Sequence, residues 1–226
     1  MELTLGIGTI VLASGSYVIG DAFSLPSKQS ILLLDRADVN RFDRGATYNT
    51  SKSARYISDI TDYAALSLPL FHLISKNSRR DFGKIVIMSA ETMLASTALT
   101  LLFKNSIHRP RPLMYNPNVP IESKWKKDNY RSFFSGHTAQ TAAMSFFFAQ
   151  TFSDYHPRSK WKPVIWSACA ALPVLTGVMR YEAGKHYWTD VITGYAVGAL
   201  VGVGIPYLHR VGMKKKKEKL DSAILK

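Results

Sequence analysis

The sequence predicts an all-α fold, a helix bundle with six membrane-spanning helices. Two observations carry this prediction. Six apolar stretches alternate with polar connections, and most are close to the ~20 residues that a helix needs to cross a bilayer. Basic residues also collect in the connections on one side of the expected bundle. The apolar stretches lie near residues 4–20, 60–75, 85–103, 138–152, 163–179 and 187–208.

Length and composition fit a single folded domain. The chain has 226 residues, of which 46% are hydrophobic, and its one cysteine, Cys169, excludes an intramolecular disulfide. We expect one domain in four parts: a first apolar helix (1–20), an extramembrane segment (21–59), a helix bundle (60–209) and a basic tail (210–226).

The N-terminal part is interpreted as a membrane helix over 4–20, with a signal peptide or anchor as the alternative. Glu2 stands where a secretory signal has basic residues, which disfavours the signal peptide. The charged stretch 35–59 predicts an amphipathic helix or an ordered loop outside the apolar core, with its charges on a solvated face.

The remaining stretches predict the bundle itself. The first of them is short for a span, and Glu91 lies inside the next, where it must face protein or water. The last stretch is the clearest span, because Gly194, Gly198 and Gly202 recur every four residues and let helix backbones approach closely in lipid. A soluble buried helix is the alternative, favoured by a mean hydropathy of only −0.03.

The formal net charge of +13 is concentrated in a few places. The tail and the connections 76–84 and 154–162 are basic, which places them, with both termini, on the cytoplasmic side of a cell (inner) membrane. The segment 104–134 on the opposite side is also basic. The rule that basic residues collect on the cytoplasmic side does not explain this segment unless its cations serve a ligand. No ribonucleoprotein motif, zinc-ligand spacing or basic zipper accompanies these patches, which argues against nucleic acid as a partner.

Three polar clusters stand at the ends of apolar stretches on that opposite side. They contain Lys104 and Arg111, then Ser135, Gly136 and His137, and finally Arg180, His186 and Asp190. Ser135 is an ordinary helix N-cap, yet the N–H groups at such a helix start also bind anions, and Gly136 lets a ligand approach. His186 and Asp190 are four residues apart and share a helix face, so that Asp190 can hold the imidazole. Each cluster alone has a structural interpretation, but their common side favours a functional site.

The pattern Lys-x6-Arg-Pro, Ser-Gly-His and Arg-x5-His-x3-Asp spans Lys104 to Asp190. It resembles the type 2 phosphatidic-acid phosphatase superfamily, which includes membrane lipid phosphatases, soluble bacterial acid phosphatases and vanadium haloperoxidases. Phe134 and Met179 depart from the family, which usually has Pro and Ser at these positions. Neither position carries the chemistry, so we expect altered geometry or specificity and no loss of activity.

The resemblance implies a role for each motif residue. It makes His186 the nucleophile that forms a phosphohistidine, His137 the general acid and base, and Asp190 the residue that orients His186. Fixed cations must neutralise the oxygens of a phosphate dianion before it can react, which agrees with the basic clusters. No metal and no other cofactor is expected. The residues expected to bind phosphate are Lys104, Arg111, Ser135, Gly136 and Arg180.

The leading hypothesis is an integral membrane phosphatase that hydrolyses a phosphomonoester or diphosphate of a lipid, with its active site on the periplasmic or extracytoplasmic side. Its expected partners are a lipid phosphate and the bilayer. The alternatives are a soluble or peripheral acid phosphatase, a vanadium-dependent haloperoxidase and a basic membrane scaffold without activity. Phosphatidylglycerol phosphate, undecaprenyl diphosphate, phosphatidic acid and the phosphates of lipid A are all open as substrates, as are the oligomeric state and the roles of Glu91 and 21–59.

Overall fold

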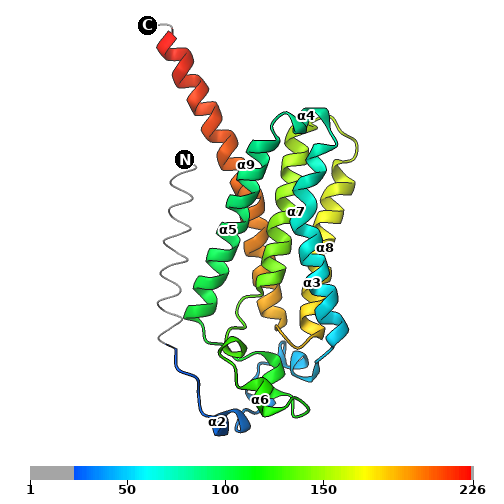
Figure 1. The fold of residues 1–226 in the computed structure, drawn as a ribbon, viewed down its shortest axis with the longest axis vertical. Coiled ribbons are helices and arrows are strands. Elements are labelled where there is room, and N and C mark those ends of the chain that lie inside the picture. The colour runs from blue at the N-terminus through cyan, green and yellow to red at the C-terminus, as the bar shows by residue number, and fades with distance from the viewer. Residues whose placement is uncertain (1–22, 225–226) are drawn as a thin grey trace.

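The computed structural model describes residues 23–224, and within them the chain is helical and contains no strand (Figure 1). The α-helices are α2 (Lys28–Leu32), α3 (Lys52–Ser67), α4 (Lys76–Arg79), α5 (Phe82–Ser106), α6 (Ile121–Lys124), α7 (Gly136–Tyr155), α8 (Lys162–Glu182) and α9 (Trp188–Ile224). The 3-10 helices are η1 (Arg36–Asp38), η2 (Arg44–Tyr48), η3 (Leu68–Leu73), η4 (Pro112–Tyr115) and η5 (Lys127–Tyr130). The all-α class predicted from the sequence is thus confirmed.

Three of the described helices are long and apolar enough to cross a membrane. They are α5, α8 and the part of α9 that covers Trp188–Arg210. Only 28%, 22% and 33% of their apolar windows are buried, and Leu200 on α9 is 74% exposed. Apolar side chains that point outward in such numbers suit a lipid environment.

The expected count of six spans is met only in part. The stretch 4–20 lies outside the described residues. Helices α3 and α7 stand where two further spans were expected, but neither is among the described helices that meet both length and composition criteria. Helix α3 begins at Lys52, before residue 60, because the Ser51 hydroxyl accepts a hydrogen bond from the backbone N–H of Ala54 at 3.2 Å. The bundle therefore takes in the end of the segment that was expected to lie outside it.

Helix α7 packs against α3, α5, α8 and α9 and so forms the centre of the bundle (Figure 1). The glycines of α9 explain its closest contact. The facing residues belong to α7 and its N-cap. A Cβ added at Gly194, Gly198 or Gly202 would collide with the backbone carbonyl oxygen of Ser135, Ala139 or Ala143, respectively. The close backbone approach predicted from the four-residue glycine spacing is confirmed.

The bundle ends differ in what they carry. Short helices α2 and α6 gather at one end, whereas α4 and the connection between α7 and α8 lie at the other (Figure 1). The basic connections 76–84 and 154–162 therefore share one end, and the three polar clusters share the opposite end. Between the ends, the Glu91 carboxylate on α5 lies 2.6 Å from Nε2 of His209 on α9, so this costly charge faces a protein partner.

Candidate active site

A cavity of about 410 Å³ opens at the end of the bundle where the short helices gather. All three sequence clusters contribute side chains to its wall. Lys104 comes from the last turn of α5, Arg111 precedes η4, His137 lies in the first turn of α7 and Arg180 in the last turn of α8. Tertiary structure thus brings together residues that are far apart in the chain.

His186 is fully buried in the loop between α8 and α9, and its imidazole is held by the backbone. Its Nδ1 lies 2.8 Å from the carbonyl oxygen of Ser132. Because a carbonyl oxygen only accepts hydrogen bonds, Nδ1 carries the proton and Nε2 keeps its lone pair. Burial, and then the positive charges of the cavity, hold the pKa of His186 well below its ordinary value of 6.5. The imidazole is therefore neutral at pH 7, the form a nucleophile needs.

Several buried polar atoms at the site have no hydrogen-bond partner in the described part of the chain. They are Nε2 of His186, Nε of Arg111 and Nε of Arg180. The guanidinium groups are anchored by other atoms: Arg111 Nη2 lies 2.9 Å from an Asp128 oxygen, and Arg180 Nη1 donates to the Ser58 hydroxyl at 3.3 Å. Since buried donors are almost always paired, the two unpaired guanidinium N–H groups of Arg111 and Arg180, which line the same cationic cavity, indicate a site for an anion. The unpartnered Nε2 of His186 is an acceptor that keeps a free lone pair.

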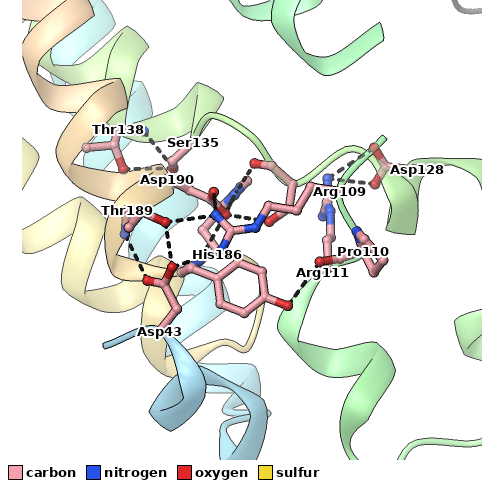
Figure 2. A network of polar contacts seen from close by, with 12 residues as sticks. Asp43, Arg109, Pro110, Arg111, Asp128, Ser135, Thr138, His186, Thr189 and Asp190 are labelled. Carbon is pink, nitrogen blue, oxygen red and sulfur yellow. Dashed lines mark hydrogen bonds and ion pairs between the residues drawn. The ribbon is translucent and has the colours of Figure 1, made fainter. Parts of the chain in front are cut away.

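Ser135 and Gly136 are placed at the start of α7, next to Lys104. The Ser135 hydroxyl accepts a hydrogen bond from the backbone N–H of Thr138 at 3.4 Å and lies 2.8 Å from the Thr138 hydroxyl, so it acts as an N-cap (Figure 2). A Cβ on Gly136 would lie 3.0 Å from Thr100 Cγ2 and 3.6 Å from Lys104 Nζ. The glycine therefore lets α7 approach Lys104 closely. Contact of Ser135 and Gly136 with phosphate stays a prediction.

Asp190 is buried in the first turn of α9 but does not hydrogen-bond to the imidazole as the sequence spacing suggests. Its nearest carboxylate oxygen lies 3.7 Å from His186 Nδ1, which is too far for a hydrogen bond. That oxygen accepts hydrogen bonds from the Ser132 hydroxyl at 2.5 Å and from the backbone N–H of Tyr187 at 3.0 Å. Asp190 thus fixes the hydroxyl of Ser132, and the carbonyl of Ser132 fixes the imidazole of His186. The expected direct hydrogen bond from His186 to Asp190 is replaced by this indirect link, because the Ser132 carbonyl lies nearer to Nδ1 than the carboxylate does.

A buried network beneath the site connects the segment before α3 to α9 (Figure 2). Arg109 donates to Asp43 at 2.8 Å and to Asp190 at 2.5 Å, and Asp43 also accepts from the backbone N–H and hydroxyl of Thr189. Asp43 is fully buried, so the expectation that the charges of 35–59 lie on a solvated face is wrong for this residue. Burial alone would raise the pKa of Asp43, but hydrogen bonds from Asn40, Thr189 and Arg109 outweigh it and lower the pKa.

Helix α3 adds cavity residues that no sequence motif indicates. Arg55, Asp59, Asp62 and Tyr63 line the cavity, and the Asp59 carboxylate lies 3.1 Å from Nε2 of His137 and 3.6 Å from Nη1 of Arg180. The signal was present in their spacing, because residues three and four apart share a helix face, but it needed the knowledge that α3 belongs to the bundle. Among residues 23–224, no group of three or more His, Cys, Asp or Glu is arranged to hold a metal ion.

A second cavity of about 230 Å³ adjoins the first. Asp62, Lys104 and His137 line both. From there the second cavity runs between α5 and α7, where Leu101 and Gln140 contribute to its wall. The second cavity is thus a lateral extension of the site beside α5, a helix that is long and apolar enough to cross a membrane.

The described residues thus form an all-helical, apolar bundle with a cationic, histidine-bearing cavity at one end. The sequence model of the PAP2 superfamily matches residues 85–213, and the chain belongs to this superfamily.

Individual proteins resemble the chain as well. It is 26% identical over 223 residues to a probable diacylglycerol pyrophosphate phosphatase 1 of Schizosaccharomyces pombe, covering 88% of this chain and 77% of that protein. It is 28% identical over 189 residues to a lipid A 1-phosphatase of Porphyromonas gingivalis, covering 79% of this chain but only 36% of that longer protein.

One solved structure has the same fold. A transmembrane PAP2-type phosphatidylglycerolphosphate phosphatase from Bacillus subtilis superposes with a TM-score of 0.54 at 19% identity, covering 92% of this chain and 96% of that chain.

Proposed function

We propose that the chain is an integral membrane phosphatase that removes phosphate from a lipid phosphomonoester or diphosphate through a phosphohistidine on His186, without a metal. One observation carries the proposal: the buried Nε2 of His186 is unpartnered within the described residues, and the cations that act on the imidazole are Arg180, Lys104 and Arg111. A neutral imidazole among fixed cations is what attack on a phosphate dianion requires.

The reaction follows from these positions. Nε2 of His186 attacks phosphorus while the bond from phosphorus to the leaving oxygen breaks, and the cations hold the non-bridging oxygens. His137 donates a proton to the departing oxygen and then takes one from the water that hydrolyses the phosphohistidine. Asp59 fixes the His137 ring, and Asp190 lies close enough to His186 to favour its positive charge during the intermediate.

Several features support a lipid substrate. The cavity adjoins the lateral extension between α5 and α7, and three described helices are long and apolar enough to span a bilayer. Two relatives are named as phosphatases of lipid phosphates. These features favour a membrane enzyme over a soluble acid phosphatase that acts on small esters.

The test is phosphate release from phosphatidic acid by protein purified in detergent. We expect His186→Ala to lose roughly 10³-fold or more of the turnover. We expect His156→Gln, which changes a histidine at the opposite end of the bundle, to retain it. Equal turnover by wild type and His186→Ala disproves the proposal. Rapid quenching with labelled substrate tests the intermediate, because a phosphohistidine is labile to acid and stable to base.

The positive-inside rule supports an orientation with the active site on the extracytoplasmic side of the cell membrane and the basic end in the cytoplasm. Because Cys169 is buried, single exposed cysteines report each end. We expect an impermeant maleimide added to intact cells to label Ser123→Cys, on the site side, and to leave Asn77→Cys unlabelled until the cells are broken. The reverse pattern contradicts this orientation.

A further inference from the structure

Two cations of the cavity are not among the residues that define the three motifs. Arg55 lies on α3, and Lys185 directly precedes His186 in the loop between α8 and α9. The cavity wall holds five cationic side chains but only three carboxylates. Two of the cations therefore stand in excess of the carboxylates. Arg55 is placed by α3, and Lys185 occupies an unspecified position of the third motif, between Arg180 and His186.

Each carboxylate of the cavity is already engaged by another group. Asp128 pairs with Arg111 at 2.9 Å, and Asp59 lies 3.1 Å from His137 and 3.6 Å from Arg180. Asp62 accepts a hydrogen bond from the Thr141 hydroxyl at 3.0 Å. Within residues 23–224, neither Arg55 nor Lys185 forms an ion pair with a carboxylate.

Lys185 is held among like charges, which is unfavourable unless an anion joins them. Burial, and then the neighbouring charges of Arg111, Arg55 and Arg180, lower its pKa to about 8. Asp128 is the one nearby carboxylate that acts in the opposite direction, and it is already bonded to Arg111. The cationic wall of the cavity thus includes Lys185 and Arg55 in addition to Lys104, Arg111 and Arg180.

The cavity is also larger than one phosphoryl group needs. Its volume of about 410 Å³ is many times the ~10–15 Å³ that one water molecule needs on the same measure of volume. Together, the space and the excess cations favour a ligand with two adjacent phosphate groups.

We propose that Arg55 and Lys185 form a second phosphate subsite, which makes the preferred substrate a lipid diphosphate. Its terminal phosphate lies at His186 and its inner phosphate at Arg55 and Lys185. The inference rests on the proposed phosphatase function and deepens it by naming the substrate class.

The subsite acts on the leaving group. Nε2 of His186 bonds to the terminal phosphorus, and the bond from that phosphorus to the bridging oxygen breaks. The bridging oxygen keeps the electron pair and leaves as part of a lipid phosphomonoester, whose developing negative charge Arg55 and Lys185 stabilise. Water then hydrolyses the phosphohistidine to free His186 and orthophosphate. A monoester substrate leaves as an alkoxide, which needs a proton from His137 and gains little from the two cations.

The experiment compares kcat/KM for diacylglycerol pyrophosphate and phosphatidic acid of the same acyl chains in one detergent. In the wild type we expect the diphosphate to be preferred. We expect Arg55→Gln and Lys185→Met each to lower its kcat/KM about tenfold or more, with a less than about threefold loss on phosphatidic acid. Lys52→Gln removes a charge from the same end of α3 outside the cavity and serves as the matched control.

A second measurement needs no lipid diphosphate. In the wild type we expect inorganic pyrophosphate to inhibit the hydrolysis of phosphatidic acid at a concentration about tenfold or more below that of inorganic phosphate, and we expect Arg55→Gln to remove this difference. Equal losses on both lipids, or equal inhibition by the two anions, overturn the second subsite while the phosphatase function stands. If the wild type releases phosphate from neither lipid, the proposed function fails first.

Discussion

Nδ1 of His186 lies 2.8 Å from the carbonyl oxygen of Ser132, so a backbone group fixes the tautomer of the candidate nucleophile. The carboxylate that the sequence assigns to this task acts one step away, because Asp190 accepts a hydrogen bond from the hydroxyl of the same Ser132. Ser132 thus contacts both His186 and Asp190 at the start of α9, although no motif position marks it.

The first prediction concerns Ser132→Ala. Without the hydroxyl, Asp190 loses a donor and the carbonyl at His186 is free to shift, so we expect kcat to fall about 10²-fold with little change in KM. Steady-state kinetics on phosphatidic acid measure both constants. Ser123→Ala, on an exposed residue of α6, is the control. A change confined to KM contradicts the positioning role.

Asp59→Asn separates a positioning role from a merely structural one. Asp59 holds the ring of His137, whose proton is needed most when the leaving group is a poor one. We therefore expect a loss of about tenfold or more on an alkyl phosphate such as phosphatidic acid, and a smaller loss on p-nitrophenyl phosphate. His137→Ala gives the reference pattern. Equal losses on the two substrates contradict the link between Asp59 and proton transfer.

Asp43→Asn tests the buried network. It leaves the donors of Arg109 and Thr189 without their charged acceptor, and we expect a loss of about 3 kcal/mol in the free energy of unfolding. A melting curve in detergent measures this loss as a lower Tm. Asp38→Asn, on an exposed residue of the same segment, is the matched control.

The same carboxylate gives a pH dependence of stability. The folded pKa of Asp43 lies below the ordinary 3.8, so its ionised form stabilises the protein above that pH. This contribution is lost as the pH falls through about 4 towards the folded pKa. We expect the Tm of the wild type to drop in this range and that of Asp43→Asn to drop less. Parallel curves for the two proteins contradict the assignment.

The glycines of α9 predict opposite effects at two positions. Gly198→Ala places a Cβ against the carbonyl oxygen of Ala139, and we expect a loss of about 1–3 kcal/mol in stability. Gly204→Ala meets nothing within 4 Å and replaces a poor helix former, so its Tm is unchanged or higher. Thermal melts of both variants in one detergent check this contrast, which fails if the two variants lose stability equally.

The last prediction concerns the effect of Lys185 on the pH dependence of kcat/KM. Its pKa of about 8 means that the charged form, which the proposed second subsite requires, is present below this pH and is lost above it. We expect kcat/KM for diacylglycerol pyrophosphate to fall as the pH rises through about 8, and Lys185→Arg to move this fall to higher pH because arginine stays protonated. Superimposable pH profiles for the two proteins contradict the role of Lys185.

Much of the site was predictable from the sequence. Lys104, Arg111, His137 and Arg180 were all expected at one end of a helix bundle, and they line one cavity there. The prediction worked because each stands at the end of an apolar stretch, and consecutive helices that reverse direction bring alternate ends together. The close approach of α7 and α9 was likewise encoded in glycine spacing, which is a local property of the chain.

Other features depended on contacts between distant segments. No local pattern encodes that Asp43 and Arg109 face each other and not water. Nor does a local pattern encode that the Ser132 carbonyl, and not Asp190, hydrogen-bonds to His186. The place of Asp59 and Arg55 in the site depended on α3 joining the bundle. The helices, their polar ends and the cationic residue types at those ends follow from local features of the sequence. Which charges are paired follows only from the folded arrangement, because pairing depends on burial and on separation in space.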